Sequence, residues 1–437
     1  MAIAWDAATV AKDFMGKYYF KSRAPFSQCP KCKSRAFGVL NVGGVHYMRR
    51  CNDCDFSQTF NLPKPSKKLV YIDQYAISFD VKEKVGRAHK KWPAVKRALE
   101  HALHMEAIVC PYSEFHEGES SLEKNLAKEL KHTYKRFAQG EIFLPTVCVE
   151  MTQIARALKQ FVGKPEETIS AKWEDVLQRD PHVWTSDIYF TFNTETAREV
   201  ETTARKVKTQ ISARMYDLNA NFKASKKSFK EQYLLEAQQV GVNMMKIYTN
   251  DIAKLMACKT PMEMITAKME GSPFADQAAY ILKFFSDRGA DEAEKWKNIV
   301  EFLKSQEFFG VDYVRINSAL WAGLARRVGL GEAVVKASDY NDVPIISHYA
   351  PYCDAMLIDD GMRSLLTTNP VKDCLKLKTK FFSPNCFDEF VSYLNGVVSE
   401  LPQDVKETVL AIHGEFPNPG IFSRIKGLWR SLCHMCK

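Results

Sequence analysis

Four cysteines near the N-terminus limit what this chain can fold into more than any other feature. They form two C-x2-C pairs, Cys29 and Cys32 in QCPKCKS and Cys51 and Cys54 in RCNDCDF, with eighteen residues between the pairs. Two pairs of thiolates, each in a tight turn, supply the four ligands that a tetrahedral Zn²⁺ takes. The competing interpretation is a pair of disulfides in a secreted domain, which needs an oxidising compartment.

The segments around these cysteines favour the metal interpretation. The N-terminus, MAIAWDAATVAKDF, has no basic stretch followed by an apolar run. We therefore expect no signal peptide and a cytoplasmic location. Between the pairs, AFGVLNVGGVHYMRR predicts two short strands around a Gly43–Gly44 turn. Two metal-binding turns joined by a hairpin resemble a zinc ribbon, in which structural zinc stabilises a module too small for a sufficient core.

Positive charge is concentrated in the same part of the chain. The formal net charge is +9, and residues 1–68 hold eight Lys and four Arg against four Asp, a balance of +8. A basic module on a nearly neutral body favours an acidic partner such as nucleic acid, although a solubilising surface is the plainer explanation. Tyr47, Phe37 and Phe56 either stack on bases or fill the core of the ribbon. The cations available to phosphates are Lys31, Lys33, Arg35, Arg49, Arg50, Lys64, Lys67 and Lys68.

A linker and a buried strand follow the basic module. The stretch NLPKPSKK, residues 61–68, breaks helix and strand patterns, and Leu69 to Ile72 is a short apolar run suited to a buried strand. Asp73 stands at the end of that run, where α/β sheets place their functional sites. Asp73 can equally cap the helix that follows.

A second apolar run, Ala107 to Cys110, predicts another strand and is followed by three glutamates in PYSEFHEGES. In a helix over 113–120, Ser113, His116, Glu117 and Ser120 share one face, and Glu114 lies one turn before Glu117. Glutamates also favour the first turn of any helix through the macrodipole, which accounts for one or two of the three. The candidates are Glu114, Glu117 and Glu119.

The most acidic stretch lies late in the chain, in KASDYNDVPIISHYAPYCDAMLIDDGMRSLL. Asp339 or Asp342 can start a helix, because Pro344 is tolerated in a first helical turn. Ala355 to Ile358 predicts a buried strand, and TKFFSPNCFDEFVSYL predicts a further strand at Phe381–Phe382 and an amphipathic helix. Around the first of these strands stand three more acids, Asp354, Asp359 and Asp360.

So many acids indicate a divalent-cation site. Carboxylates brought together repel one another unless a cation intervenes, and hard oxygen ligands suit Mg²⁺ or Mn²⁺. Two such ions can clamp the attacking and leaving oxygens of a phosphodiester. The predicted ligands are Asp73, Glu117, Glu119, Asp339, Asp342, Asp354, Asp359 and Asp360.

These motifs resemble the PIN-like nucleases, a family with a compact α/β fold, a parallel sheet and an acidic metal site. The family pattern is an aspartate after the first strand, a glutamate early in a helix and two later aspartates around the fourth strand. Asp73 in LVYID matches the aspartate after the first strand. Glu117 in PYSEFHEGE is the best match for the helix glutamate, with Glu114 and Glu119 as rivals. Asp342 in NDVPIISH and Asp359 or Asp360 in AMLIDD match the others. The resemblance implies catalysis by Asp73, Glu114, Glu117, Asp342, Asp359 and Asp360.

The resemblance covers roughly 67–120 and 335–400, with more than two hundred residues between its halves. Residues 121–330 are predicted to be helical throughout, an insertion of six to nine helices that offers a protein-partner surface. A basic stretch from Arg198 to Lys230 lines a nucleic-acid groove or forms a solvated helix face. The domains expected are a zinc ribbon (1–66), an α/β PIN-like domain in two parts (67–120 and 335–437, the second with a helical tail) and the α-helical insertion (121–334).

The C-terminus and the hydropathy profile complete the prediction. The tail GIFSRIKGLWRSLCHMCK is basic and amphipathic, either a membrane-surface or partner contact or a packed helix. Cys433 and Cys436 in this tail are a weak indication of a second zinc site. No run of eighteen apolar residues exists, so no transmembrane segment is expected.

The function expected is a metal-dependent nuclease with a structural Zn²⁺ and a catalytic Mg²⁺ or Mn²⁺. RNA is favoured over DNA because the resemblance implies it, and the roles open to such an enzyme are RNA processing, toxicity and defence. The alternative is a non-catalytic protein whose zinc ribbon binds nucleic acid or protein.

Overall fold

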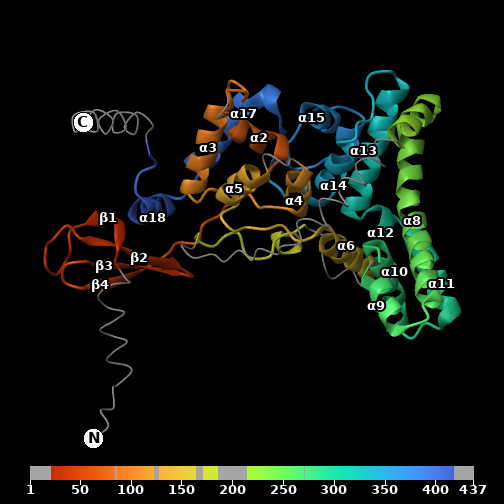
Figure 1. The fold of residues 1–437 in the computed structure, drawn as a ribbon, viewed down its shortest axis with the longest axis horizontal. Coiled ribbons are helices and arrows are strands. Elements are labelled where there is room, and N and C mark those ends of the chain that lie inside the picture. The colour runs from red at the N-terminus through yellow and green to blue at the C-terminus, as the bar shows by residue number, and fades with distance from the viewer. Residues whose placement is uncertain are drawn as a thin grey trace, which may run out of the picture.

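The computed structural model describes residues 21–83, 86–122, 127–163, 171–185, 214–269 and 271–417. Two four-stranded sheets organise this part of the chain. The antiparallel sheet lies at one end of the molecule, the parallel sheet lies near the middle, and a group of long helices forms the other end (Figure 1).

The antiparallel sheet carries the cysteine motif. Its strands are β1 (Arg23–Ser27), β2 (Phe37–Gly43), β3 (His46–Cys51) and β4 (Ser57–Asn61), paired in chain order. The predicted hairpin is present, because β2 and β3 pair up to Gly43 and His46, and Gly44 takes a φ of +63° in the turn. Positive φ is costly for residues with a Cβ, which explains the glycine. The flanking strands β1 and β4 have mostly exposed residues and give no hydrophobic pattern in the sequence.

The parallel sheet is built from both ends of the domain in the order β6-β5-β7-β8. Its strands are β5 (Lys68–Ile72), β6 (Ile108–Val109), β7 (Ala355–Leu357) and β8 (Lys380–Phe382). Val70 pairs with Ala355 and Ile72 pairs with Leu357, so segments almost three hundred residues apart form adjacent central strands. The mixed α/β class with a parallel sheet and a small antiparallel sheet is therefore confirmed.

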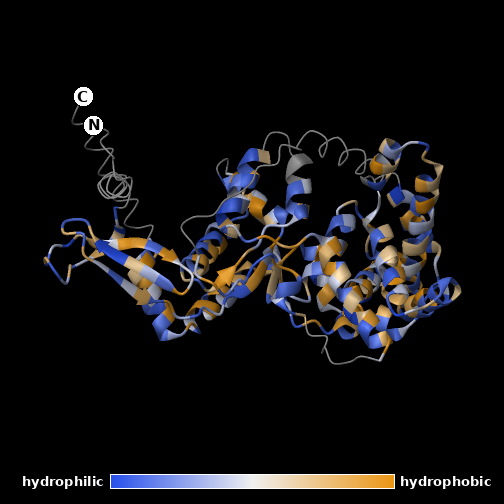
Figure 2. Ribbon diagram, turned by 90° about the horizontal axis from the view of Figure 1, so that it is seen from below, coloured by the Kyte–Doolittle hydropathy of each residue, from blue (hydrophilic) through white to orange (hydrophobic). Residues whose placement is uncertain are grey.

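Alternating side chains of the parallel strands enter two cores. Val70 and Ile72 pack with Trp92 and Phe387 on one face, whereas Leu69 and Tyr71 pack on the other. The strands at the centre of Figure 2 are correspondingly apolar. The first core is covered by α2 (Gln74–Glu83), α3 (Trp92–His104), α5 (Ala127–Ala138), α17 (Phe387–Ser399) and α18 (Gln403–His413), and the second by α13 (Asp312–Gly329), α14 (Asp339–Tyr349), α15 (Asp360–Thr367) and α16 (Val371–Leu375).

The middle of the chain is largely helical and has its own core around Phe302 and Phe308. A helical segment at 214–224 also lies in this part of the chain, but its Met215 and Phe222 pack in the second core of the parallel sheet. The named helices here are α6 (Thr146–Phe161), α8 (Phe229–Ala257), α9 (Pro261–Met269), α10 (Pro273–Ser286), α11 (Glu292–Leu303) and α12 (Gln306–Phe309).

The prediction of helix throughout 121–330 is wrong at residues 142–143 and over 171–185, where the structure has only a short 3₁₀ helix at Trp173–Asp175. Ile142 bridges Tyr112 in parallel, and Phe143 bridges Leu177 in the antiparallel sense. Gln139 and Gly140, with φ values of +49° and +85°, follow the end of α5 at Ala138, and Pro145 precedes the first residue of α6. The short extended segment between them therefore adds backbone pairing beside the parallel sheet.

Candidate metal centres

The four predicted cysteines converge at one end of the antiparallel sheet. The Sγ atoms of Cys29 and Cys54 are 3.6 Å apart, as are those of Cys32 and Cys51. All four Sγ atoms lie within 4.8 Å of one another. A tetrahedral ZnS₄ centre with Zn–S bonds of about 2.3 Å has sulfurs about 3.8 Å apart, so this donor set fits Zn²⁺.

The two cysteine pairs sit in turns of the same construction. Lys33 N–H donates to the Cys29 carbonyl at 3.0 Å, and Asp55 N–H donates to the Cys51 carbonyl at 3.1 Å. Lys33 and Asp55 both take positive φ, +64° and +58°. The chain thus reverses direction immediately after each C-x2-C, which turns both thiols of a pair toward the same point.

Ser34 is a polar contact of this centre that no motif in the sequence indicates. Its Oγ lies 3.4 Å from the Sγ of Cys32 and 3.4 Å from that of Cys51. The hydrogen bonds with Ser34 lower the pKa of Cys32 to about 6. A hydroxyl at this position stabilises the thiolate form, which is the form that binds metal.

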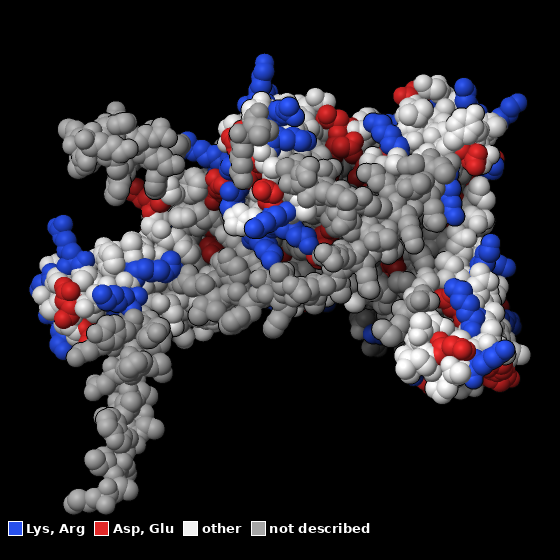
Figure 3. Space-filling view, viewed as in Figure 1, with Lys and Arg blue, Asp and Glu red and all other residues white. Residues whose placement is uncertain are grey.

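The aromatic and basic residues of the ribbon divide between core and surface. Phe37 and Tyr47 are buried, as the core interpretation predicted. Arg49 is also buried and donates to the carbonyls of Pro25 and Phe37, and Lys67 is buried against Glu106, so the prediction that these two cations meet phosphates is wrong. The exposed cations of the cysteine turns are Lys31, Lys33 and Arg35. Lysine and arginine side chains gather at this end of the face in Figure 3.

The predicted acidic residues gather mainly at the carboxyl edge of the parallel sheet. Asp73 follows β5 and is buried, and its backbone N–H donates to the carbonyl of Leu357 at the end of β7. Asp359 follows β7 and caps α15, because its Oδ1 accepts from the N–H groups of Gly361 and Met362. Neighbouring parallel strands thus end in aspartates on one edge.

Electrostatic coupling links further aspartates to this edge. The hydroxyl of Tyr75 donates to the Ile358 carbonyl at 2.7 Å. Burial, and then the charges of Asp73, Asp359 and Asp360, raise the pKa of Tyr75 well above its ordinary value. Burial and the charge of Asp359 also raise the pKa of Asp339. We call Asp73, Asp339, Asp359 and Asp360 the acidic edge.

Asp339 and Asp342 lie in the first turn of α14. Asp339 is buried and accepts from the Lys336 N–H at 2.7 Å, so it starts the helix. Asp342 is half-buried one turn further along. The structure therefore decides between the two predicted helix-starting residues in favour of Asp339.

The glutamates lie on α4 (Glu114–Leu122), which His116 attaches to the sheet. The Nδ1 of His116 accepts from the Ser113 N–H at 3.0 Å, so its Nε2 carries the proton and donates to the Ile72 carbonyl, also at 3.0 Å. Burial lowers the pKa of His116 to about 3. A neutral histidine thus connects the start of α4 to the residue immediately before Asp73.

Glu114 and Glu117 are both exposed and both have partners. Glu114 Oε1 accepts from the N–H and hydroxyl of Thr146 at 2.9 and 2.7 Å. Glu117 forms an ion pair of 3.0 Å with Lys131. The side chain of the third candidate, Glu119, lies outside the described residues.

The prediction of Asp354 as a ligand with the others is wrong. Asp354 precedes β7, and its carboxylate accepts from Lys68 Nζ at 3.0 Å and from the Leu69 N–H at 2.9 Å. It therefore lies at the amino edge of the sheet, four residues along the strand direction from Asp73. At about 3.3 Å per residue the two are about 13 Å apart, too far for one ion.

The acidic edge is less convergent than the cysteine centre. Within the described ranges, the four cysteines are the one group of three or more Cys, His, Asp or Glu residues whose ligand atoms all lie within 4.8 Å. Mg²⁺ usually keeps several waters and takes only one or two protein carboxylates, so an ion at the acidic edge would need only one or two of these aspartates as direct ligands.

Some predicted features lie in segments that the structure does not describe. Cys433, Cys436, residues 198–213 of the basic stretch and the tail from Gly420 lie outside the described residues. Among the helices that are described, none is both long enough and apolar enough to cross a bilayer.

Comparison of the chain with family models, with curated proteins and with solved structures gave no match.

Proposed function

We propose that this protein is a metal-dependent nuclease of the PIN-like type, with RNA as its favoured substrate. The observation that carries the proposal is the acidic edge, where aspartates from chain segments almost three hundred residues apart share one edge of a parallel sheet. Carboxylates held at that edge are typical of active sites in α/β folds.

The electrostatics of the edge support a cation there. A buried Asp339 close to Asp359 is destabilised in its charged form, and the pKa of Asp339 is raised accordingly. A bound Mg²⁺ or Mn²⁺ would neutralise this repulsion, act as a Lewis acid and lower the pKa of a coordinated water. Asp73 and Asp359 are the ligands we assign first, because they end adjacent strands. Asp360, which is exposed beside them, would be a further candidate ligand.

Other residues of the chain would orient these ligands and contact the substrate. Asp73 is fixed by the Gln74 N–H, which donates to its Oδ1 at 2.7 Å. His116 keeps α4, with Glu114 and Glu117, beside the end of β5. The exposed Lys31, Lys33 and Arg35 of the zinc module would bind phosphates away from the acidic edge.

The decisive experiment is cleavage of end-labelled RNA and DNA in Mn²⁺, Mg²⁺ or EDTA, with zinc restored after chelation. Asp73→Asn and Asp359→Asn are expected to lower the cleavage rate by about 100-fold or more, because each removes an anionic ligand. Asp354→Asn is the matched control: it removes an aspartate at the opposite edge and is expected to cleave like the wild type. Melting temperatures of all variants establish that they are folded.

Equal loss of cleavage in Asp354→Asn would show that the acidic edge is not the site. No metal-dependent cleavage of any substrate, together with tight RNA binding that depends on zinc, would instead favour the non-catalytic zinc-ribbon binding protein.

A further inference from the structure

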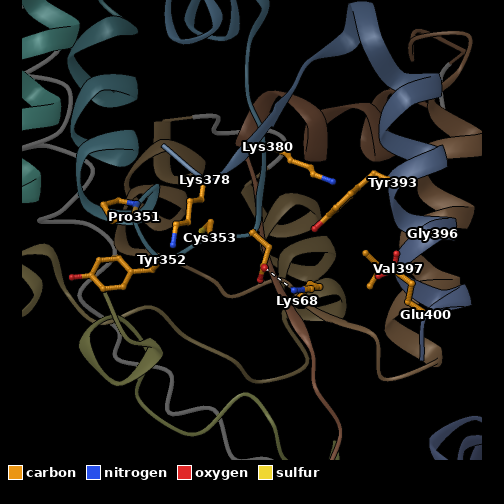
Figure 4. A pocket seen from close by; sticks show the side chains of 11 residues that line it. Lys68, Pro351, Tyr352, Cys353, Lys378, Lys380, Tyr393, Gly396, Val397 and Glu400 are labelled. Atoms are coloured by element: carbon orange, nitrogen blue, oxygen red, sulfur yellow. Dashed lines mark hydrogen bonds and ion pairs between the residues drawn. The ribbon is translucent and has the colours of Figure 1, made fainter. Parts of the chain in front are cut away.

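A cavity of about 480 Å³, shown in Figure 4, is lined by residues at the starts of the parallel strands and therefore opens at the amino edge of the parallel sheet. Its wall combines the starts of β5 and β8 with the segment before β7 and one side of α17. Lys68 in this wall and Asp73 at the acidic edge are five residues apart on β5, which is about 17 Å. A molecule in the cavity would therefore not touch the acidic edge.

The cavity presents cationic side chains. Lys378, Lys380 and Lys68 line it, together with the acids Asp354 and Glu400. Asp354 is already paired, since Lys68 Nζ and the Leu69 N–H occupy its two oxygens. Lys378 and Lys380 form no ion pair within the described part of the chain. Lys378 and Lys380 are two residues apart at the start of β8. Both line the same wall of the cavity, because alternate residues of an extended chain point to the same side.

Tyr393 adds a buried donor. Its hydroxyl is inaccessible to solvent and has no hydrogen-bond partner among the described residues. In Figure 4 this hydroxyl points into the space between Lys380 and the segment that carries Cys353. The Nζ of Lys380 lies 4.9 Å from the centre of the Tyr393 ring. A buried hydroxyl without an acceptor is energetically costly, so an acceptor brought by a ligand would be stabilising here.

We propose that this cavity binds a small phosphorylated ligand of nucleotide size. Its volume is within the range of about 300–1,000 Å³ that small-molecule sites occupy. Lys378 and Lys380 would act as the point charges that lysines offer to phosphates, and Tyr393 would donate to a phosphate oxygen. Tyr352 and Tyr393 supply the aromatic part of the wall for the remainder of the ligand. The site does not depend on nuclease activity, and its separation from the acidic edge makes the ligand an effector or a separate substrate.

Isothermal titration of the zinc-loaded full chain with AMP, inorganic pyrophosphate and adenosine tests the proposal. AMP and pyrophosphate are expected to bind saturably and adenosine is not, because the phosphate carries the recognition.

The double variant Lys378→Gln/Lys380→Gln, which keeps the side-chain length approximately, should weaken AMP binding by about tenfold or more. Tyr393→Phe removes only the hydroxyl and should weaken binding by about two- to tenfold without lowering the melting temperature. Lys372→Ala, an exposed lysine of α16 outside the cavity, is the control and should bind AMP unchanged.

Three results would overturn the proposal. The first is no saturable binding of AMP or pyrophosphate at millimolar concentration. The second is unchanged affinity in both Lys378→Gln/Lys380→Gln and Tyr393→Phe, which would locate binding elsewhere. The third is displacement of AMP by a 5′-phosphorylated RNA oligonucleotide that binds about tenfold more tightly than AMP, which would assign the cavity to an RNA end rather than to a small molecule.

Discussion

His116 shows how a single neutral side chain positions a candidate active site. Its ring is fully enclosed between the end of β5 and the start of α4 and stacks on Tyr71, with ring centres 5.1 Å apart. Protonation of Nδ1 would break the hydrogen bond from the Ser113 N–H and bury a charge without a counter-ion. Burial therefore holds the pKa of His116 near 3 in the folded protein, against 6.5 in a model compound.

This depressed pKa predicts a loss of stability in acid. Between pH 6.5 and pH 3 the unfolded chain binds a proton at His116 and the folded chain does not, so the free energy of unfolding falls as the pH falls. His116 contributes up to about 1.4 kcal/mol per pH unit to the slope of the free energy of unfolding against pH. Urea unfolding at pH 5 to 7, followed by tryptophan fluorescence, should show a shallower pH dependence for His116→Gln than for the wild type. The same pH dependence of the free energy of unfolding in the two proteins would contradict this prediction.

The sequence alone located most candidate residues but not their partners. The cysteine spacing predicted a four-thiol site, because ligand geometry is local to two turns. The strands that carry Asp73 and Asp359 were predicted because buried parallel strands are short apolar runs. Asp354 was misassigned because it was grouped with acids that follow strands, whereas it precedes β7 and therefore lies at the opposite edge of a parallel sheet. Ser34, Tyr393 and the pair of Lys67 and Glu106 give no local pattern, because each depends on a tertiary contact.

At the scale of elements, the antiparallel sheet is stabilised in two different ways. Val39, Val42 and Tyr47 belong to the same core as Trp92 and Ile412. The cysteine turns have only a small cluster around Cys29, Phe37 and Cys51. Structural zinc contributes about 10–16 kcal/mol in small modules, so the turns should depend on the metal while the far end of the hairpin depends on the domain.

Loss of zinc is therefore expected to affect only part of the ribbon. The double substitution Cys29→Ser/Cys32→Ser should abolish zinc binding by the four-cysteine centre and raise hydrogen exchange over residues 29–34 and 51–56. Exchange in the parallel sheet should stay unchanged. Hydrogen–deuterium exchange by mass spectrometry checks this, with Cys148→Ser, an exposed thiol elsewhere, as the control. Rapid exchange across β5 and β7 in the double variant would show that the metal stabilises the whole molecule.

Close helix packing beneath the sheet depends on Gly323 in α13. A Cβ at this position would lie 2.5 Å from Val371 Cγ2 and 2.9 Å from Leu365 Cδ1, both in buried side chains. Gly323→Ala is therefore expected to cost about 1–3 kcal/mol of stability through overpacking, despite the better helix propensity of alanine. Gly396→Ala in α17, where a Cβ would meet nothing within 4 Å, should instead stabilise by about 0.5–1 kcal/mol. Thermal unfolding of both variants measures the contrast, and a Gly323→Ala variant as stable as Gly396→Ala would show that α13 has room to shift.

At the scale of the whole molecule, one buried carboxylate joins distant segments. Glu106 follows α3 with a φ of +56°, a position where glycine is usual. Its carboxylate contacts Lys67 Nζ at 2.5 Å and His413 Nε2 at 3.6 Å, and it accepts from Thr185 Oγ1 at 3.1 Å. Lys67 belongs to the linker after the ribbon and His413 to α18, so Glu106 holds the ribbon, the parallel sheet and the last described helix together.

Removal of this charge should destabilise the molecule as a unit. Burial alone would raise the pKa of Glu106, but the nearby His413 and the charge of Lys67 outweigh it and hold the pKa below its ordinary value. The stabilisation is thus complete above the unfolded-state pKa of 4.5 and is lost as the pH falls through the lower folded-state value. Glu106→Gln leaves Lys67 buried without a counter-ion and should cost about 3–5 kcal/mol at pH 7. Lys64→Ala, which breaks the exposed 3.8 Å pair with Asp180, should cost less than about 1 kcal/mol. Urea unfolding at pH 7 compares the two, and equal small losses would mean that water reaches Lys67 when Glu106 is neutral.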